Sequence, residues 1–134
     1  MTQEAMQVST AVTDGIRVIV RSRYLAEQSF PAAGRYAFSY EVRIRNEGPQ
    51  AARLIARHWV ITDSTGKEQE VRGPGVVGEQ PFLRPGEHFD YTSGAVLETT
   101  SGQMQGSYQM QRPNGRLFDA AIAPFLLARP YSLN

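Results

Sequence analysis

Three glycines near the middle of the chain have the spacing of a nucleotide-binding loop. Gly73, Gly75 and Gly78 lie within residues 72–81 and match the string G-x-G-x-x-G. In dinucleotide-binding proteins such glycines lie between a strand and a helix, because the free N–H groups at the helix N-terminus hold the pyrophosphate. A nucleotide site therefore requires that a helix can follow these glycines.

The residues after the glycines exclude a helix. Pro81, Pro85 and Gly86 occur within six residues, and a proline inside a helix removes a hydrogen bond and collides with the preceding turn. A P-loop also needs Lys and then Ser or Thr after its last glycine, yet Glu79 and Gln80 occupy those positions. A carboxylate stands where a cation is required, so a tight nucleotide site is excluded.

A weaker chemistry is open to the same loop, because consecutive backbone N–H groups can form a concave anion site without a helix. Three such donors at roughly 2 kcal/mol each, against at least ~4 kcal/mol for the lost freedom of the ligand, support about millimolar affinity. Two arginines flank the glycines. The candidate ligand-binding residues are Arg72, Gly73, Gly75, Val76, Val77, Gly78 and Arg84.

Three interpretations of this loop remain open. In the first, the loop is a structural segment that crosses between two sheets while Val76 and Val77 fill the core. In the second, it binds phosphate weakly through its backbone. In the third, it contacts a protein partner. The first interpretation needs the glycines only for their backbone freedom.

Residues that could catalyse a reaction or bind a metal are few and scattered. The chain has no cysteine and two histidines, His58 and His88, which are thirty positions apart. No H-x-H or H-E-x-x-H spacing is present, and Ser93 lacks the G-x-S-x-G context of a nucleophile elbow. We therefore expect a non-enzymatic protein with no catalytic residue, no metal site and no cofactor. His58 and Trp59 are expected to pack within a strand, with His88 facing solvent.

The elements around the glycine segment have the alternating pattern of β-strands. Strands are predicted at residues 16–23, 36–45, 52–62, 67–72, 88–91, 95–99, 103–111 and 117–123. No stretch shows a sustained helical period. About seven strands joined by short turns indicate an all-β protein, an immunoglobulin or fibronectin type III-like β-sandwich with antiparallel strands.

Local features refine this prediction. Residues 52–62 are apolar on both faces, with Leu54, Ala56, His58 and Val60 alternating against the other side, which favours a central strand, whereas residues 67–72 are polar and edge-like. Ser93 and Gly94 predict a bulge. Asn114 and Gly115 predict a two-residue hairpin turn, after which Phe125 and Leu127 are expected to pack on the core.

Length and charge limit the class of protein. The 134 residues suit one domain, residues 1–134, with an ordered core at about 15–128. A net charge of +1 without a block of like charge does not favour a nucleic-acid partner. Seven arginines alternate along the predicted strands and are expected to line their solvent faces: Arg17, Arg21, Arg23, Arg43, Arg45, Arg53 and Arg57.

Targeting signals are absent from the sequence. Its first residues have neither the basic start nor the apolar run of a signal peptide. The longest apolar stretch, residues 122–128, is far short of the ~20 residues that a membrane span needs. We expect a cytoplasmic protein without a membrane partner.

Several strings resemble the bacterial ApaG family: R-H-W-V-I-T at 57–62, E-V-R-G-P-G-V-V-G-E-Q-P at 70–81, Y-T-S-G at 91–94 and G-Q-M-Q-G-S-Y at 102–108. The resemblance extends from about Ile16 to Leu127. It implies a fibronectin type III-like sandwich and an interaction module, because similar domains occur in eukaryotic F-box proteins and in a DNA polymerase delta interacting protein. It also implies a loose link to cobalt and magnesium tolerance, and it supplies no catalytic residue.

Together these observations predict a binding module that presents residues 73–81 and a neighbouring sheet face to a protein partner. The alternative is weak binding of phosphate or a dinucleoside polyphosphate, linked to divalent-metal metabolism, by the loop amides with Arg72 or Arg84. A homodimer formed through an exposed edge strand is a further expectation.

Overall fold

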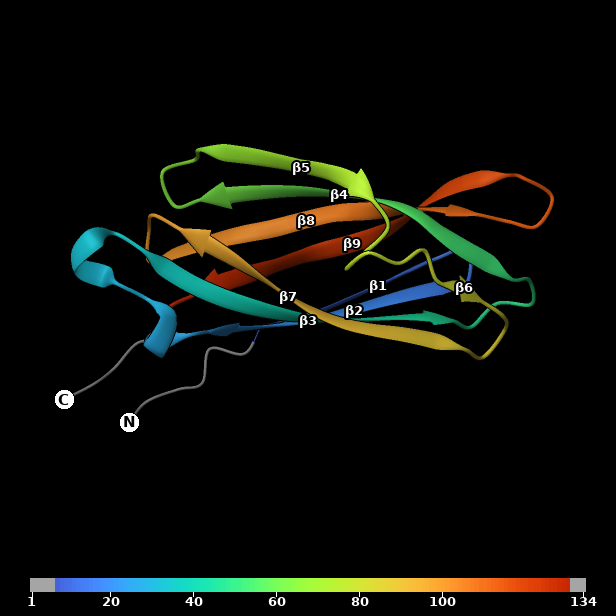
Figure 1. The fold of residues 1–134 in the computed structure, drawn as a ribbon, viewed down its shortest axis with the longest axis horizontal. Helices are drawn as coiled ribbons and strands as arrows, with labels where there is room; N and C mark the ends of the chain where they lie inside the picture. The colour runs from blue at the N-terminus through green and yellow to red at the C-terminus, as the bar shows by residue number, and fades with distance from the viewer. Residues whose placement is uncertain (1–6, 131–134) are drawn as a thin grey trace.

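Nine β-strands make up most of residues 7–130, the part of the chain that the computed structural model describes (Figure 1). They are β1(Gln7–Thr13), β2(Ile16–Tyr24), β3(Tyr36–Asn46), β4(Ala52–Asp63), β5(Glu68–Pro74), β6(Phe82–Leu83), β7(His88–Leu97), β8(Ser101–Gln111) and β9(Leu117–Ala128). One sheet has the order β1-β2-β3-β7, and the other has the order β5-β4-β8-β9 with β6 paired to β4. All pairs are antiparallel.

This arrangement confirms the predicted all-β sandwich. Between residues 7 and 130 the helical segments are two short 3-10 turns, Ala26–Gln28 and Pro31–Ala33. No helix in that range is long and apolar enough to cross a membrane. Two strands, β1 and β6, lie outside the predicted set, and β1 precedes the expected ordered core.

The core lies between the sheets and follows the predicted alternation of β3. The even-numbered residues from 38 to 44 are buried, whereas residues 41, 43 and 45 are exposed. From the facing sheet, Trp59, Tyr108 and Phe125 pack against this row, and the ring centroids of Tyr40 and Trp59 are 5.3 Å apart. Phe125 and Leu127 are both buried, as predicted.

β4 lies between β5 and β8, which confirms its predicted central position. Its alternation, however, changes part-way. Leu54 and Trp59 are both buried although they are an odd number of positions apart, and the register with β8 shifts between Leu54 and Ala56. Ile55 is therefore the extra residue of a β-bulge, which reverses the faces of the residues that follow. The prediction that Leu54 shares one face with Ala56 and His58 is wrong for this reason.

Two other local predictions are wrong. β7 pairs with β3 through Ser93 and Gly94 without a register shift, so no bulge occurs there. Gly94 instead allows close approach, because a Cβ at this position would lie 3.3 Å from the carbonyl oxygen of Phe38. The β8–β9 hairpin has a three-residue loop closed by Arg112 N–H donating to Arg116 O at 2.9 Å, and Asn114 does not take a positive φ.

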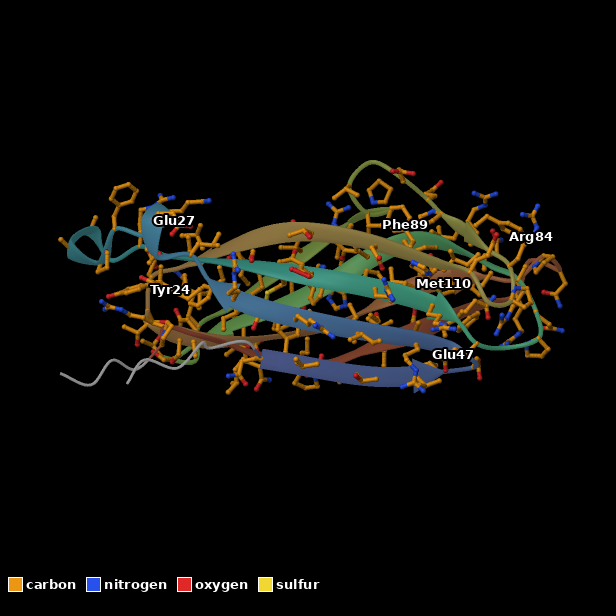
Figure 2. All side chains as sticks on the ribbon, turned by 90° about the horizontal axis from the view of Figure 1, so that it is seen from below. Tyr24, Glu27, Glu47, Arg84, Phe89 and Met110 are labelled. Atoms are coloured by element: carbon orange, nitrogen blue, oxygen red, sulfur yellow. The ribbon has the colours of Figure 1, made fainter. Side chains whose placement is uncertain are left out.

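The two lateral sides of the sandwich differ. On one side β9 lies against β1 and β2, where Ser22 Oγ donates to Leu126 O at 2.6 Å and Ala121 N donates to Thr13 Oγ1 at 3.0 Å. We call this the closed side. On the other side β5 and β7 end the two sheets without a strand beyond either. We call this the open side; β7 borders the first sheet at the top of Figure 2, and β1 borders it at the bottom.

Candidate functional site

The glycine segment lies on the open side. Residues 75–81 connect β5 to β6, and both of these strands pair with β4. The segment therefore stays at the margin of one sheet, and it stands out beyond β7 in Figure 2. The chain crosses to the other sheet later, at residues 84–87, where Gly86 N donates to Asn46 O at 2.7 Å. The interpretation of the glycine segment as the crossing itself is wrong.

The bulge in β4 fixes both ends of this loop. The carbonyl oxygen of Ile55 accepts a hydrogen bond from Gly75 N at 2.8 Å and another from Gln80 Nε2 at 2.9 Å. In a regular strand this carbonyl would accept a hydrogen bond from a neighbouring strand. As the extra residue of the bulge, Ile55 makes no such bond, so its carbonyl can accept hydrogen bonds from the loop. One acceptor thus joins the start and the end of the loop.

Two arginines of β4 add further hydrogen bonds to the loop backbone. Arg57 Nη1 donates to Pro74 O at 2.9 Å and to Gly75 O at 3.0 Å. Arg53 Nη1 donates to Gln80 O at 2.8 Å. Hydrogen bonds from charged donors are stronger than neutral ones, so these contacts hold the loop in one conformation. Arg53 is exposed, as predicted for a solvent face, but both Arg53 and Arg57 also bind this loop, which was not predicted.

Residues 76–79 form a tight turn at the tip of the loop. Val76 N donates to Glu79 O at 2.8 Å, and Glu79 N donates to Val76 O at 2.9 Å. The two central residues, Val77 and Gly78, have φ angles of 43° and 80°. Positive φ at both central positions is the geometry of a type I′ turn.

Two glycines of the string have separate steric reasons. Gly73 lies beneath the guanidinium of Arg57, since a Cβ at Gly73 would come within 2.9 Å of Arg57 Nη2. Gly75 has a φ of 60°, and a Cβ there would collide with the carbonyl oxygen of Glu79. The glycines therefore allow the backbone to fold tightly on β4, and no helix follows them.

The two valines of the loop have opposite environments. Val76 is 1% exposed and belongs to the core, as predicted. Val77 is 56% exposed at the tip of the turn, so the prediction that it fills the core is wrong. A type I′ turn makes this unavoidable, because its central residues point away from the strands that it joins.

Half of the amides at residues 75–80 already have partners. Gly75, Val76 and Glu79 each donate to a backbone carbonyl, as given above. Among the described residues, the amides of Val77, Gly78 and Gln80 have no hydrogen-bond acceptor, and those of Val77 and Gly78 are adjacent. Two adjacent donors are thus available at the tip, one fewer than the number assumed for a nest from sequence.

The two arginines predicted to flank the loop bind elsewhere. Arg72 lies on the exposed face of β5, with Nη2 3.5 Å from Glu70 Oε2. Arg84 has its guanidinium carbon 5.8 Å from the ring centroid of Phe82 and its Nη1 3.9 Å from Glu87 Oε2. Figure 2 shows Arg84 toward the end of the molecule rather than on the loop. The structure does not bring these two side chains together over the glycines.

A slot of about 300 Å³ opens between the two sheets on the open side, near the start of β5 and away from the loop. It reaches the rings of Tyr40 and Trp59 and is lined by Tyr40, Trp59, Ile61, Gln69, Gly94, Ala95, Val96 and Met104. Further along the same side, the hydroxyls of Tyr91 and Tyr108 form a hydrogen bond between the sheets. Burial raises the pKa of both hydroxyls above the ordinary value for tyrosine.

His88 and Arg43 pair with Asp90 at the surface, whereas the Nε2 atom of His58 is buried and has no hydrogen-bond partner among the described residues. His58 Nε2 lies 3.5 Å from Glu70 Oε2, and the solvent-facing His88 has its Nε2 3.6 Å from Asp90 Oδ2. Arg43 donates to both carboxylate oxygens of Asp90, and this contact holds the pKa of Asp90 below its ordinary value. No group of three or more potential metal ligands occurs in the described part of the chain.

Sequence reasoning missed the residues that hold the loop, namely Arg53, Ile55 and Arg57. A signal for them is present in the sequence. Leu54 and Trp59 are large apolar residues of β4, and their odd separation places them on opposite faces of a regular strand. The bulge between them turns both toward the same core.

The fold and the loop define a class of protein: a fibronectin type III-like β-sandwich whose β5–β6 connection is a glycine-rich turn clamped on a bulge in β4. A family model described as the ApaG domain matches residues 26–112. The chain belongs to the ApaG family.

Relatives of similar length support this assignment. Protein ApaG of Anaeromyxobacter dehalogenans (strain 2CP-C) is 56% identical over 127 residues, which cover 95% of this chain and 100% of the relative. Protein ApaG of Xanthomonas euvesicatoria pv. vesicatoria (strain 85-10) is 57% identical over 89% of this chain and 94% of its own length. The crystal structure of the ApaA protein of Bordetella pertussis matches with a TM-score of 0.85 and 51% identity, covering 87% of this chain and 95% of the other.

Proposed function

We propose that the chain is a non-enzymatic interaction module that presents the turn at residues 76–79 to a protein partner. One observation carries the proposal: Val77 is exposed, apolar and held at a positive φ. The left-handed conformation costs a residue with a Cβ roughly 1–2 kcal/mol, and a β-branched residue there is an outlier. Such strain persists where the surroundings enforce it, and it concentrates at functional sites.

A second turn in the same molecule shows what folding alone would favour. The β1–β2 turn has φ angles of 46° at Asp14 and 82° at Gly15, nearly the angles of Val77 and Gly78. Asp-Gly is one of the preferred pairs for a type I′ turn, because Asp tolerates the left-handed conformation. Val77 stands where Asp14 stands in the other turn. Packing does not explain the valine, since more than half of its surface is exposed.

Neighbouring features suit a rigid binding surface. The Ile55 carbonyl and the guanidinium groups of Arg53 and Arg57 fix the loop, so little conformational entropy remains to be lost on binding. Phe82, which follows the loop, is also partly exposed, with the guanidinium carbon of Arg53 5.2 Å from its ring centroid. An apolar tip beside an aromatic ring with attached arginines resembles the anchor residues of protein interfaces.

The test exchanges the strained residue. Val77→Asn creates an Asn-Gly turn, so we expect the free energy of unfolding to rise by about 1 kcal/mol while the partner is lost. Val77→Ile keeps both the strain and the apolar surface and should change neither property. Asp14→Val is the matched control in the other turn and should destabilise by about 1 kcal/mol. Urea unfolding measures stability, and pull-down from a bacterial lysate measures partner binding.

The proposal fails if Val77→Asn retains every protein that the wild type and Val77→Ile retain. It also fails if Val77→Asn lowers the free energy of unfolding. In that case valine would not reduce the stability of the turn, and no strain would need a functional explanation.

Weak anion binding is the second candidate, and the two available amides of Val77 and Gly78 are the observation in its favour. Two donors at roughly 2 kcal/mol each only balance the ~4 kcal/mol lost on binding, so any affinity is weaker than millimolar. Titration with pyrophosphate, a dinucleoside polyphosphate, Mg²⁺ and Co²⁺, followed by backbone amide shifts, tests it. Unchanged shifts at Val77 and Gly78 in the presence of all four would exclude it.

A further inference from the structure

The edge strand β5 has no bulge and no inward-pointing charge, and its charged residues lie on the outward face. β5 pairs with β4 from residue 68 to residue 74 without a register shift, so it contains no bulge. Its inward row consists of the uncharged residues Gln69, Val71 and Gly73. Bulges, inward-pointing charges and prolines protect most natural edges, and here the one proline, Pro74, is at the end of the strand. Figure 1 shows β5 along the upper border with no strand beyond it.

The outward row of β5 is complementary to itself. It carries Glu68, Glu70 and Arg72, all exposed. If two copies of β5 pair antiparallel about a two-fold axis through Glu70, Glu68 of each copy lies opposite Arg72 of the other. Directly opposed residues in such a pair have their Cβ atoms about 4.5–5.5 Å apart, and opposite charges there are stabilising. The same register places Gln69 opposite Val71, so no charge turns inward.

The centre of this register brings two Glu70 side chains together, which alone would be unfavourable. Each Glu70 already has a cationic neighbour, because its Oε2 lies 3.5 Å from Arg72 Nη2, and His58 Nε2 lies at the same distance. Glu68 makes no ion pair with any described residue. Its charge is therefore free for a residue outside the molecule.

The neighbouring edge of β7 offers no comparable pattern. A self-pairing about Thr92 would place Asp90 opposite Gly94, and Asp90 already binds Arg43. The glycine loop also stands outside β7 in Figure 2. An unrelated strand would need its own glutamate and arginine four positions apart, whereas a second copy of this chain supplies both. We infer that β5 pairs antiparallel with β5 of a second copy, in the register centred on Glu70.

Charge reversal tests the pairing. Glu68→Arg or Arg72→Glu alone replaces two attractive pairs by two repulsive ones, and we expect the dimer dissociation constant to rise about 30-fold. A mixture of the two variants restores both attractive pairs and should form a heterodimer about as tightly as the wild type pairs with itself. Sedimentation equilibrium measures all three. A wild type that stays monomeric at its highest soluble concentration would overturn the inference, as would a mixture no tighter than the separate variants.

Disulfide trapping tests the register, since the native chain has no cysteine. Opposed residues have Cα atoms ~4.5–5.5 Å apart, within the range that a disulfide bridges. Glu70→Cys should therefore form a covalent dimer under mild oxidation. Glu68→Cys alone and Arg72→Cys alone should form no covalent dimer, whereas a mixture of the two should crosslink. Crosslinking of Arg72→Cys with itself as fast as Glu70→Cys would contradict the register, whatever the oligomeric state.

Discussion

The two sheets are joined by different contacts on the closed side and on the open side of the sandwich. On the closed side, side-chain hydroxyls tie the sheets together, through Ser22 to Leu126 and through Thr13 to Ala121. On the open side, the sheets meet through the Tyr91–Tyr108 hydroxyl pair and the exposed pair of Lys67 Nζ and Glu98 Oε1 at 3.7 Å. A slot reaches the core between these contacts.

With the proposed function, recognition falls on the open side and stability on the closed side. On the closed side the end strands β1 and β9 also face each other, but side-chain hydrogen bonds join them to the opposite sheet, so these residues serve the fold. The open side carries the features that folding alone does not require: the strained Val77, the free edge of β5 and the slot above Trp59. A small domain can leave one side open in this way because the other side and the core supply its stability.

The largest expected effect concerns the floor of the open slot. Trp59 is 2% exposed and packs against Tyr40, Tyr108 and Phe125. Trp59→Ala should lower the free energy of unfolding by roughly 3–5 kcal/mol, because it leaves a large cavity. The control Val96→Ala, on an exposed side chain at the rim, should change it by less than about 0.5 kcal/mol. Equal stability of the Trp59 variant and the wild type in urea would show that the open side does not support the core.

An intermediate effect is expected at the tyrosine pair that bridges the open side. Tyr108→Phe leaves the hydroxyl of Tyr91 without its partner and should cost about 1–2 kcal/mol at neutral pH. The folded-state pKa values of both tyrosines are raised, so the folded protein binds these protons more tightly than the unfolded chain does. Their contribution to stability is full below the unfolded pKa of about 10 and is lost as the pH rises above it.

The measurement is urea unfolding at a series of alkaline pH values. The wild type should lose stability above pH ~10 more steeply than Tyr108→Phe does, because the variant has one fewer buried tyrosine to ionise. If the free energy of unfolding falls equally with pH in both proteins, the ionisation of Tyr108 does not contribute to the loss of stability.

The smallest effect compares two serines in matching positions, Ser22 and Ser93, each paired with Tyr40 in the first sheet. Ser22→Ala removes the donor to the Leu126 carbonyl and should cost about 1 kcal/mol. Ser93→Ala on β7 should cost less than about 0.5 kcal/mol, because Ser93 has no side-chain hydrogen bond to the described residues. Equal losses for the two variants, read from their urea midpoints, would remove the proposed distinction between the sides.

Much of the fold follows from the sequence, for a physical reason. β3 alternates because one face is buried, and turns contain the glycines and prolines that their φ angles require. β1 was not predicted because its pattern is inverted: Val8 and Val12 are exposed, whereas Ser9 is buried and Thr13 accepts a hydrogen bond from the backbone of β9. Tertiary contacts rather than periodicity determine that strand.

The candidate site was less predictable than the fold. The absence of a helix after Gly78 and the burial of Val76 followed from proline positions and hydrophobicity. The exposure of Val77 and the clamping by Arg57 depend on one extra residue, Ile55, which changes the direction of every later side chain on β4. One extra residue in a strand changes neither the composition of the sequence nor its average hydrophobic pattern enough to be recognised.

The closed side also determines when the molecule can become complete during synthesis. Its two side-chain hydrogen bonds join residues that are 104 and 108 positions apart. Contacts of such high sequence separation form only after nearly the whole chain has left the ribosome. The first sheet must therefore wait with the face of β1 that carries Ser9 and Thr13 uncovered until β9 is made.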